Sequence, residues 1–60
     1  MTPERFQTWQ TDRRLSDTMT ALALGMTRAT VARYAKGKTK IPFYVSLACA
    51  AISFGLPPIK

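Results

Sequence analysis

Apolar residues recur every three to four positions along most of this chain, and capping signals divide the pattern into four predicted helices. The first is predicted over residues 3–14, because Thr2 is a favourable N-cap and Pro3 suits the first helical position. Phe6 and Trp9 lie three residues apart and share one face of this helix. We expect both rings to anchor a hydrophobic core rather than to stack on bases.

The second helix is predicted over residues 17–24, with Ser16 as its N-cap. Helical spacing places three residues on its inward face: Thr20, Ala21 and Leu24. Leu15 precedes this helix and is expected to close the corner between it and the first one. Leu22 points elsewhere, and the pattern leaves open whether it packs under Trp9 or faces a partner.

A glycine turn separates the second predicted helix from the third. Gly25 supplies the positive φ that ends a helix in a tight turn, and Met26 is expected to point back into the core. Thr27 is the N-cap of the third helix, which is predicted over residues 28–36 and stops at Gly37.

The third helix divides into two faces at 100° per residue. Val31 and Tyr34 fall on the side that we expect to be buried. The opposite side carries small and basic residues: Ala29, Ala32, Arg33 and Lys36, with Arg28 at its edge. Small residues let a helix approach the floor of a DNA major groove, and alanine can contact a thymine methyl group. Alanine is also the best helix former, so a purely local explanation stays open.

The fourth helix is predicted over residues 42–53, with Pro42 in its first turn. It is apolar around most of its circumference, which is typical of a helix buried on more than one side. One side can pack on the other helices, and the rest needs a further surface, most simply a second subunit. We therefore expect residues 42–60 to form a homodimer contact through four residues: Phe43, Leu47, Phe54 and Leu56. Short connections and the lack of a strand pattern predict one all-α, compact four-helix domain over residues 1–60.

Charge is distributed unevenly along the chain. The net charge is +6, and the only acidic residues are Glu4, Asp12 and Asp17. Five basic residues and no acidic one lie between Arg28 and Lys40. Such one-sided positive charge indicates a polyanionic partner, which could be DNA, RNA or an anionic membrane. The simpler alternative is a solvated basic face that only maintains solubility.

The rarest residue types exclude several kinds of site. The chain has no histidine and one cysteine, Cys49, so it can form neither an internal disulfide nor a zinc site, and it suits a reducing cytoplasm. Cys49 lies among alanines and is expected to be a buried packing residue. The N-terminus lacks an apolar signal-peptide core, and the longest apolar run is too short to span a bilayer. We expect no enzyme activity, cofactor, small-molecule ligand or membrane partner.

Several residues of the second and third helices carry a family resemblance. Ala21, Gly25 and Val31 hold the spacing of a small residue, a turn glycine four residues on and an apolar residue six further. The surrounding positions extend the match over about residues 15–52: Leu15, Ser16, Met26, Tyr34, Lys36, Gly37 and the segment from Ile41 to Val45. This pattern resembles the helix-turn-helix of the lambda-repressor/Cro (XRE-type) DNA-binding family.

The resemblance implies that the third helix enters the major groove with its N-terminal residues at the base edges. The matching base-reading positions are Thr27, Arg28, Ala29 and Arg33. Candidates for phosphate contacts or positioning are Ser16, Asp17, Lys36, Lys38 and Lys40. Asp17 stands where the family often has a glutamine that braces the first reading residue, so we expect it to pair with Arg28 and aim it. The alternative is that Asp17 only complements the dipole at a helix N-terminus.

These observations predict a sequence-specific transcriptional regulator of the cytoplasm that binds double-stranded DNA. Small proteins of this kind resemble phage Cro-type repressors and anti-CRISPR-associated regulators, which typically repress their own operon as homodimers on palindromic sites. The alternative is a protein-interaction module on the same fold, such as an antitoxin-like or inhibitor subunit that uses the fourth helix and Leu22. A third alternative is non-specific binding to RNA or architectural binding to DNA.

Overall fold

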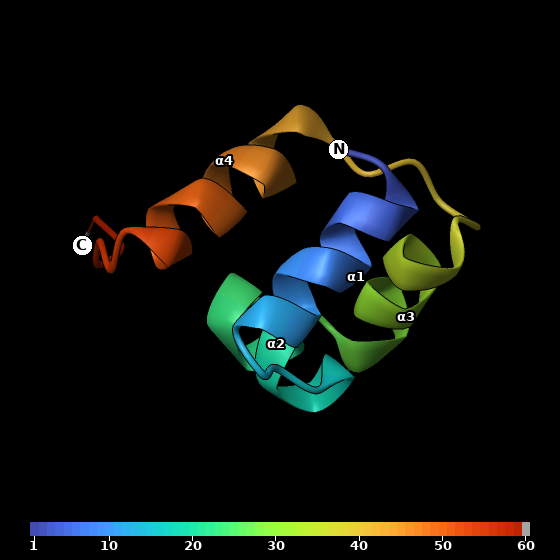
Figure 1. Ribbon diagram of the computed structural model, residues 1–60, viewed down its shortest axis with the longest axis horizontal. Coiled ribbons are helices and arrows are strands. Elements are labelled where there is room, and N and C mark those ends of the chain that lie inside the picture. Colours follow the sequence, from blue (N-terminus) through green and yellow to red (C-terminus); the bar gives the residue numbers. More distant parts are fainter. Residues whose placement is uncertain (60) are drawn as a thin grey trace.

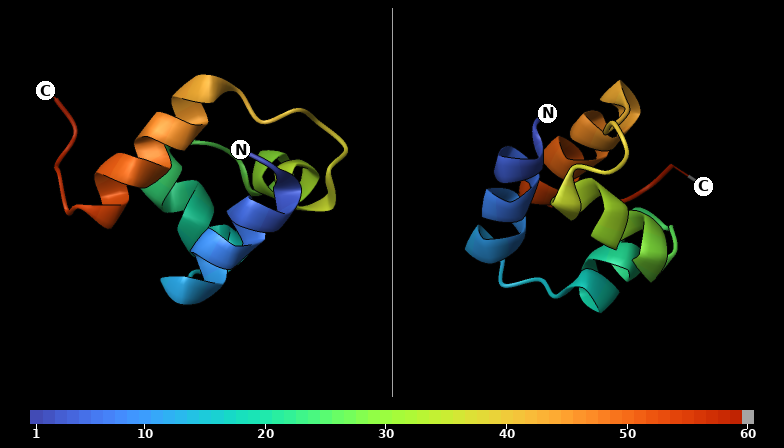
Figure 2. Two further views of the ribbon diagram at one scale, coloured as in Figure 1. Left: turned by 45° about the horizontal axis from the view of Figure 1, so that its top comes forward. Right: turned by 90° about the vertical axis from the view of Figure 1, so that its right-hand side faces the viewer.

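Four helices make up the regular structure of residues 1–59, the part of the chain that the computed structural model describes. They are α1 (Pro3–Asp12), α2 (Asp17–Leu24), α3 (Arg28–Lys36) and α4 (Phe43–Ser53). Residues 1–59 contain no strand, so the predicted all-α class is confirmed. α3 packs against α1 and α2, while α4 packs against α2 (Figure 1). The end of the described chain projects away from the four helices (Figure 2).

Three of the helices begin as their sequences predict. Thr2, Ser16 and Thr27 have extended backbones, and each side-chain oxygen accepts a hydrogen bond of 3.2 Å from the backbone N–H three residues further on. These bonds satisfy donors that a helix start otherwise leaves without a partner. α4 differs, because Pro42 is its N-cap and makes no side-chain capping bond. The expectation that Pro42 lies inside the first helical turn was therefore wrong by one residue.

α1 ends earlier than the sequence suggested. It stops at Asp12 rather than at the predicted Arg14, whose φ of 57° places it in the left-handed region. This conformation lets the backbone N–H of Leu15 donate a 2.8 Å hydrogen bond to the carbonyl of Gln10. Such a closing bond usually involves glycine at the left-handed position, so an arginine there gives no signal in the sequence.

Gly25 and Gly37 end α2 and α3 as expected, with φ values of 69° and 74°. The two turns differ in their surroundings. A Cβ atom on Gly25 would have no neighbour within 4 Å, whereas one on Gly37 would lie 3.2 Å from Cγ of Pro3. Glycine at residue 37 therefore serves both the turn and the close approach of the two chain segments.

The core forms around Phe6, which is completely buried on α1. Its ring meets Tyr34 edge-on at 5.9 Å between centroids and stacks with Trp9 at 6.1 Å. Both arrangements are favourable for aromatic pairs. The remaining buried apolar residues come from α2, α3, α4 and the segment before α4: Ala21, Val31, Ile41, Val45 and Cys49. Phe6 is thus the core anchor that the sequence predicted, and Trp9 packs against this core while partly exposed.

The inward face predicted for α2 is confirmed, since Thr20 and Ala21 are buried and Leu24 packs against the core. Met26 packs there as well. Leu22 is 74% exposed, so it does not pack under Trp9, and its role at a partner surface stays a prediction. Within residues 1–59, no helix is long and apolar enough to cross a membrane.

Candidate nucleic-acid interface

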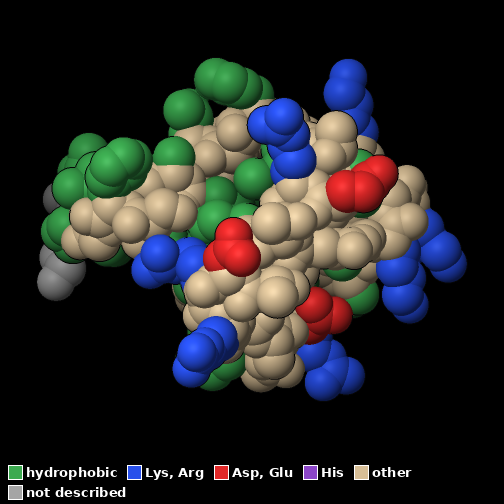
Figure 3. Space-filling view, in the orientation of Figure 1, with side chains coloured by type: hydrophobic (Ala, Val, Ile, Leu, Met, Phe, Trp, Pro, Cys, Tyr) green, Lys and Arg blue, Asp and Glu red, His purple; other side chains and the backbone are tan. Residues whose placement is uncertain are grey.

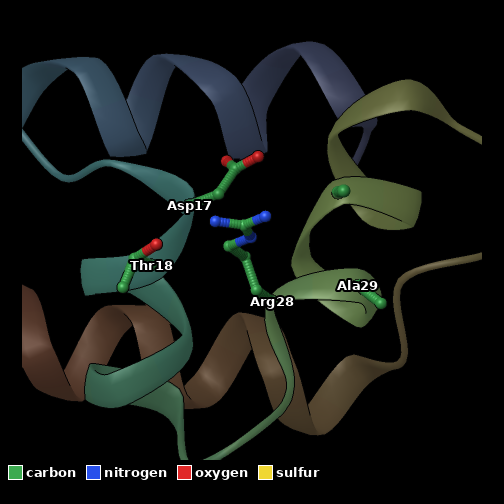
Figure 4. A pocket seen from close by; sticks show the side chains of 5 residues that line it. Asp17, Thr18, Arg28 and Ala29 are labelled. Atoms are coloured by element: carbon green, nitrogen blue, oxygen red, sulfur yellow. The ribbon is translucent and has the colours of Figure 1, made fainter.

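A hollow of about 450 Å³ lies where α2 and α3 begin (Figure 4). It is lined by five residues: Asp17, Thr18, Arg28, Ala29 and Ala32. The structure therefore brings together three residues that the sequence assigned to DNA binding or positioning, Asp17, Arg28 and Ala29. The small side chains of Ala29 and Ala32 leave space on the α3 side of the hollow, which allows a bulky ligand to approach the helix backbone. Thr18 also lines the hollow, although the sequence pattern did not single it out.

Thr27 is the N-cap of α3, and its hydroxyl forms hydrogen bonds within this helix. Its Oγ1 accepts the backbone N–H of Thr30 at 3.2 Å and lies 2.9 Å from the Thr30 hydroxyl oxygen. The hydroxyl is thus used for capping, and the predicted base contact of Thr27 stays a prediction. Ser16 has the same local role at the start of α2. Because both helices begin beside the hollow, the positive ends of two helix dipoles point to this part of the surface.

Asp17 of α2 and Arg28 of α3 both line the hollow. In Figure 4 the guanidinium group of Arg28, which is exposed, points toward the carboxylate of Asp17. The carboxylate itself is held by a different residue: Oδ1 accepts a 3.1 Å hydrogen bond from Nε2 of Gln10. Asp17 is thus oriented by α1, while Arg28 points toward it from α3. The predicted bracing of Arg28 by Asp17 remains a prediction that this orientation favours.

Gln10 is the residue of this region that the sequence analysis missed. Its side chain is only 7% exposed, and Nε2 also donates a 2.9 Å hydrogen bond to Oγ1 of the fully buried Thr20. Gln10 lies four residues after Phe6, so both share the inner face of α1. A glutamine on an otherwise apolar face was therefore the available signal, because a buried amide needs hydrogen-bond partners.

Arg33 lies further along α3 than Arg28 and is exposed on its outer side. Its Nη2 lies 3.4 Å from the Thr30 hydroxyl in a long hydrogen bond, so the side chain follows the helix toward its N-terminus. Arg33 does not line the hollow, yet it lies on the same helix as Arg28 and Ala29. The outer side of α3 therefore carries two arginines separated by small side chains.

The remaining predicted cations lie beyond the hollow. Lys36 is in the last turn of α3, and Lys38 and Lys40 lie in the connection to α4. All three are exposed, as expected for phosphate contacts. The structure does not bring them into the hollow with Arg28. They extend the basic surface along the chain instead.

The pKa shifts that bear on chemistry lie in the core and not at this surface. Burial raises the pKa of the Cys49 thiol to about 11, so the thiol is protonated at neutral pH and is a poor nucleophile. Burial, and secondarily the neighbouring Tyr44, raises the pKa of Tyr34. No group of three or more potential metal ligands occurs in the described part of the chain. The polar side chains that line the hollow are the carboxylate of Asp17, the hydroxyl of Thr18 and the guanidinium of Arg28.

A second surface runs along α4 on the side opposite the core. Val45 and Cys49 are buried, whereas the predicted dimer residues are exposed: Phe43 by 76%, Leu47 by 56%, Phe54 by 82% and Leu56 by 61%. Figure 3 shows hydrophobic side chains gathered over α4 and the end of the chain. Large exposed apolar surfaces of this kind mark interaction sites. Lys60, the last residue of the predicted dimer segment, lies outside the described residues.

Comparison with known proteins yields no relative: no protein-family model matches this chain, and no curated protein or solved structure is significantly similar to it.

Proposed function

We propose that this chain is a sequence-specific DNA-binding regulator in which α2 and α3 act as a helix-turn-helix of the lambda-repressor/Cro type. The observation that carries the proposal is the exposed side of α3, where Arg28 and Arg33 flank small residues and no acidic residue occurs from residue 28 to residue 40. A helix with long cations beside small side chains can enter a major groove and reach the base edges.

The proposed contacts follow from the positions of the side chains. Arg28, at the start of α3, donates two hydrogen bonds to O6 and N7 of a guanine, the commonest specific contact in protein–DNA complexes. Ala29 contacts a thymine methyl group, and Arg33 reads a base further along the groove. Thr27 contributes at the edge of the same region.

Phosphate contacts then fix the position of α3 without reading sequence. Lys36, Lys38 and Lys40 supply cations along one strand, and the backbone N–H groups near Ser16 supply donors at the start of α2. Asp17 would repel a phosphate, so its proposed role is to orient Arg28. Each cation that neutralises a phosphate makes the affinity more sensitive to salt.

The proposed regulator is a homodimer that pairs through α4. Phe43, Leu47, Ala50 and Phe54 follow one another at intervals of four, three and four residues, and all are exposed. This spacing forms one apolar stripe along a helix, the pattern of helix–helix contacts. Residues 41–59 carry no charge in a chain of net charge +6, so this surface escapes the repulsion that opposes association of two basic copies.

The available area also suits a dimer. A stable interface buries roughly 800 Å² on each partner, and aromatic side chains bury about 150–250 Å² each. Several large exposed side chains on one face can supply an area of this order. Two copies related by a twofold axis would present their α3 helices to half-sites about 34 Å apart on a palindromic operator. The proposed output is repression of its own operon by blocking polymerase.

Selection from a random duplex library at physiological salt tests this proposal. We expect enrichment of a twofold-symmetric site, and we expect Arg28→Ala and Arg33→Ala each to weaken binding to it by about tenfold or more. Arg5→Ala is the matched control, since it removes the same charge from α1. Recovery of no preferred sequence, with an affinity that falls steeply with salt, would contradict the proposal.

A protein-interaction module is the second candidate function. The observation that favours it is the exposure of Leu22 on α2 together with the apolar stripe of α4. An antitoxin-like or inhibitor subunit would use these surfaces to bind another protein. Absence of any base preference in the selection, combined with tight binding to a partner that Leu22→Ser abolishes, would favour this function over DNA recognition.

A further inference from the structure

We infer that Gln10 is a positioning residue for base recognition: it fixes the Asp17 carboxylate toward which Arg28 points, and thereby sets the base preference at the position that Arg28 reads. This inference rests on the proposed DNA-binding function. It assigns a specificity role to a buried residue of α1, outside the helices that touch DNA in the proposed complex.

The first step is the hydrogen bonding of the Gln10 amide. Nε2 has two N–H groups, and the structure directs one to Oδ1 of Asp17 at 3.1 Å and the other to Oγ1 of Thr20 at 2.9 Å. A carboxylate accepts hydrogen bonds and does not donate them, so its presence determines which end of the amide faces Asp17. The side chain of Gln10 is 93% buried and has no freedom to leave this arrangement without losing both bonds.

The second step connects Asp17 to Arg28. Asp17 is half-buried, its Oδ1 accepts the hydrogen bond from Gln10, and the residue lines the hollow together with Arg28. Figure 4 shows the guanidinium of Arg28 pointing toward this carboxylate. A long arginine side chain loses much rotamer freedom when it is held in one geometry. A fixed carboxylate beside it therefore favours the conformers that reach one base rather than a neighbouring phosphate.

The third step explains why the positioning residue lies on α1. Asp17 is the first residue of α2 and is partly exposed, so α2 alone does not hold its side chain in one rotamer. The Gln10 side chain reaches Asp17 from the core, and its amide also donates a hydrogen bond to the buried hydroxyl of Thr20. The bracing of Arg28 is thus linked to the packing of α1 against the other helices. Variants in α1 can consequently change sequence preference without any contact to DNA.

The test measures discrimination, defined as the affinity for the selected site divided by that for the same site with the Arg28-read base pair replaced. Gln10→Met keeps the length of the side chain and removes both donors. Gln10→Met alone leaves the buried Thr20 hydroxyl without its hydrogen-bond partner, which costs stability. The double variant Gln10→Met/Thr20→Val removes that hydroxyl as well and should therefore fold more readily. We expect both to lose about three- to tenfold in discrimination, with an unchanged salt dependence.

Two further variants separate positioning from general stability. Thr20→Val alone removes one of the two acceptors that hold the Gln10 amide and keeps the other, so it should lose less discrimination than Gln10→Met. Gln7→Met is the matched control: it makes the same substitution one turn earlier on α1, where the side-chain amide donates to the carbonyl of Ala35, and it should preserve discrimination. A merely structural role of Gln10 would lower the active fraction for every sequence equally and leave the ratio unchanged.

The outcomes distinguish this inference from the function on which it rests. Wild-type protein without any base preference overturns both. Wild-type protein with a preference that Gln10→Met/Thr20→Val retains overturns the role of Gln10 alone. Loss of discrimination in that variant supports the role, and it should be no greater in Gln10→Met/Asp17→Asn than in Asp17→Asn, because Gln10 acts through Asp17.

Discussion

The indole N–H of Trp9 in α1 donates a hydrogen bond of 2.9 Å to the hydroxyl of Ser53, the last residue of α4. The Ser53 hydroxyl donates in turn to the backbone carbonyl of Cys49 at 2.9 Å. Two residues separated by 44 positions thus connect the first helix to the end of the last one. This connection matters for function, because α4 carries the apolar stripe proposed for the dimer.

Ser53→Ala should loosen the end of α4. The variant leaves the Trp9 indole N–H without its partner, and we expect the free energy of unfolding to fall by about 0.5–1.5 kcal/mol. The fluorescence of the single tryptophan should shift to longer wavelength as water reaches the ring. Ser46→Ala, at another serine of α4, is the control and should leave the spectrum unchanged. Identical spectra for both variants would mean that the Trp9–Ser53 bond does not hold the helix.

Gly37→Ala should destabilise the fold more than Gly25→Ala. Both substitutions place alanine at a φ near 70°, which costs about 1–2 kcal/mol. Only at Gly37 does the new Cβ also meet Pro3 at 3.2 Å, so a further loss is expected there. Urea denaturation of the two variants measures the difference. An equal loss of stability would show that the Pro3 segment moves aside without cost.

Stability should fall at alkaline pH because of Cys49. The folded pKa of about 11 exceeds the ordinary value of 9.0, so between these values the native state keeps a proton that the unfolded chain releases. Stability from this group is therefore complete below pH 9 and is lost as pH rises, by about 1–2 kcal/mol at pH 11 after allowance for solvent screening. Tyr34, whose pKa is also raised, adds in the same direction.

Denaturation of the wild type and of Cys49→Ala at pH 7 and pH 10.5 measures this dependence. The variant should be less stable at pH 7, because it leaves a small cavity, but it should lose less stability on going to pH 10.5. A thiol reagent should label native Cys49 far more slowly than the unfolded chain, since the side chain is 2% exposed. Fast labelling of the native protein would contradict the burial of this residue.

Leu47→Glu should abolish dimerisation. The substitution places a charge in the centre of the α4 stripe, where a second copy would bury it without a partner. We expect a monomer by light scattering at concentrations where the wild type is a dimer, and at least a tenfold weaker affinity for a two-half-site duplex. Leu22→Glu is matched in charge and lies on α2. If it disrupts the dimer while Leu47→Glu does not, the contact surface is on α2 instead.

The helix boundaries could be predicted from the residues alone wherever a local signal acts. Thr2, Ser16 and Thr27 cap their helices with their own side chains, and Gly25 and Gly37 end theirs by their own φ. These effects involve only residues three to five positions apart, so the printed chain contains all the information they need. The burial of Phe6 and the exposure of the basic side of α3 follow equally from helical spacing.

Contacts between residues far apart in the chain depend on how the helices pack. Arg14 adopts the left-handed conformation just after the end of α1, at a position where the sequence has no glycine to signal it. The bonds of Gln10 to Asp17 and Thr20, and of Trp9 to Ser53, depend on the angles at which helices cross. Helical spacing tells which face is buried but not which side chain lies opposite, and that choice is made by the shape of the whole core.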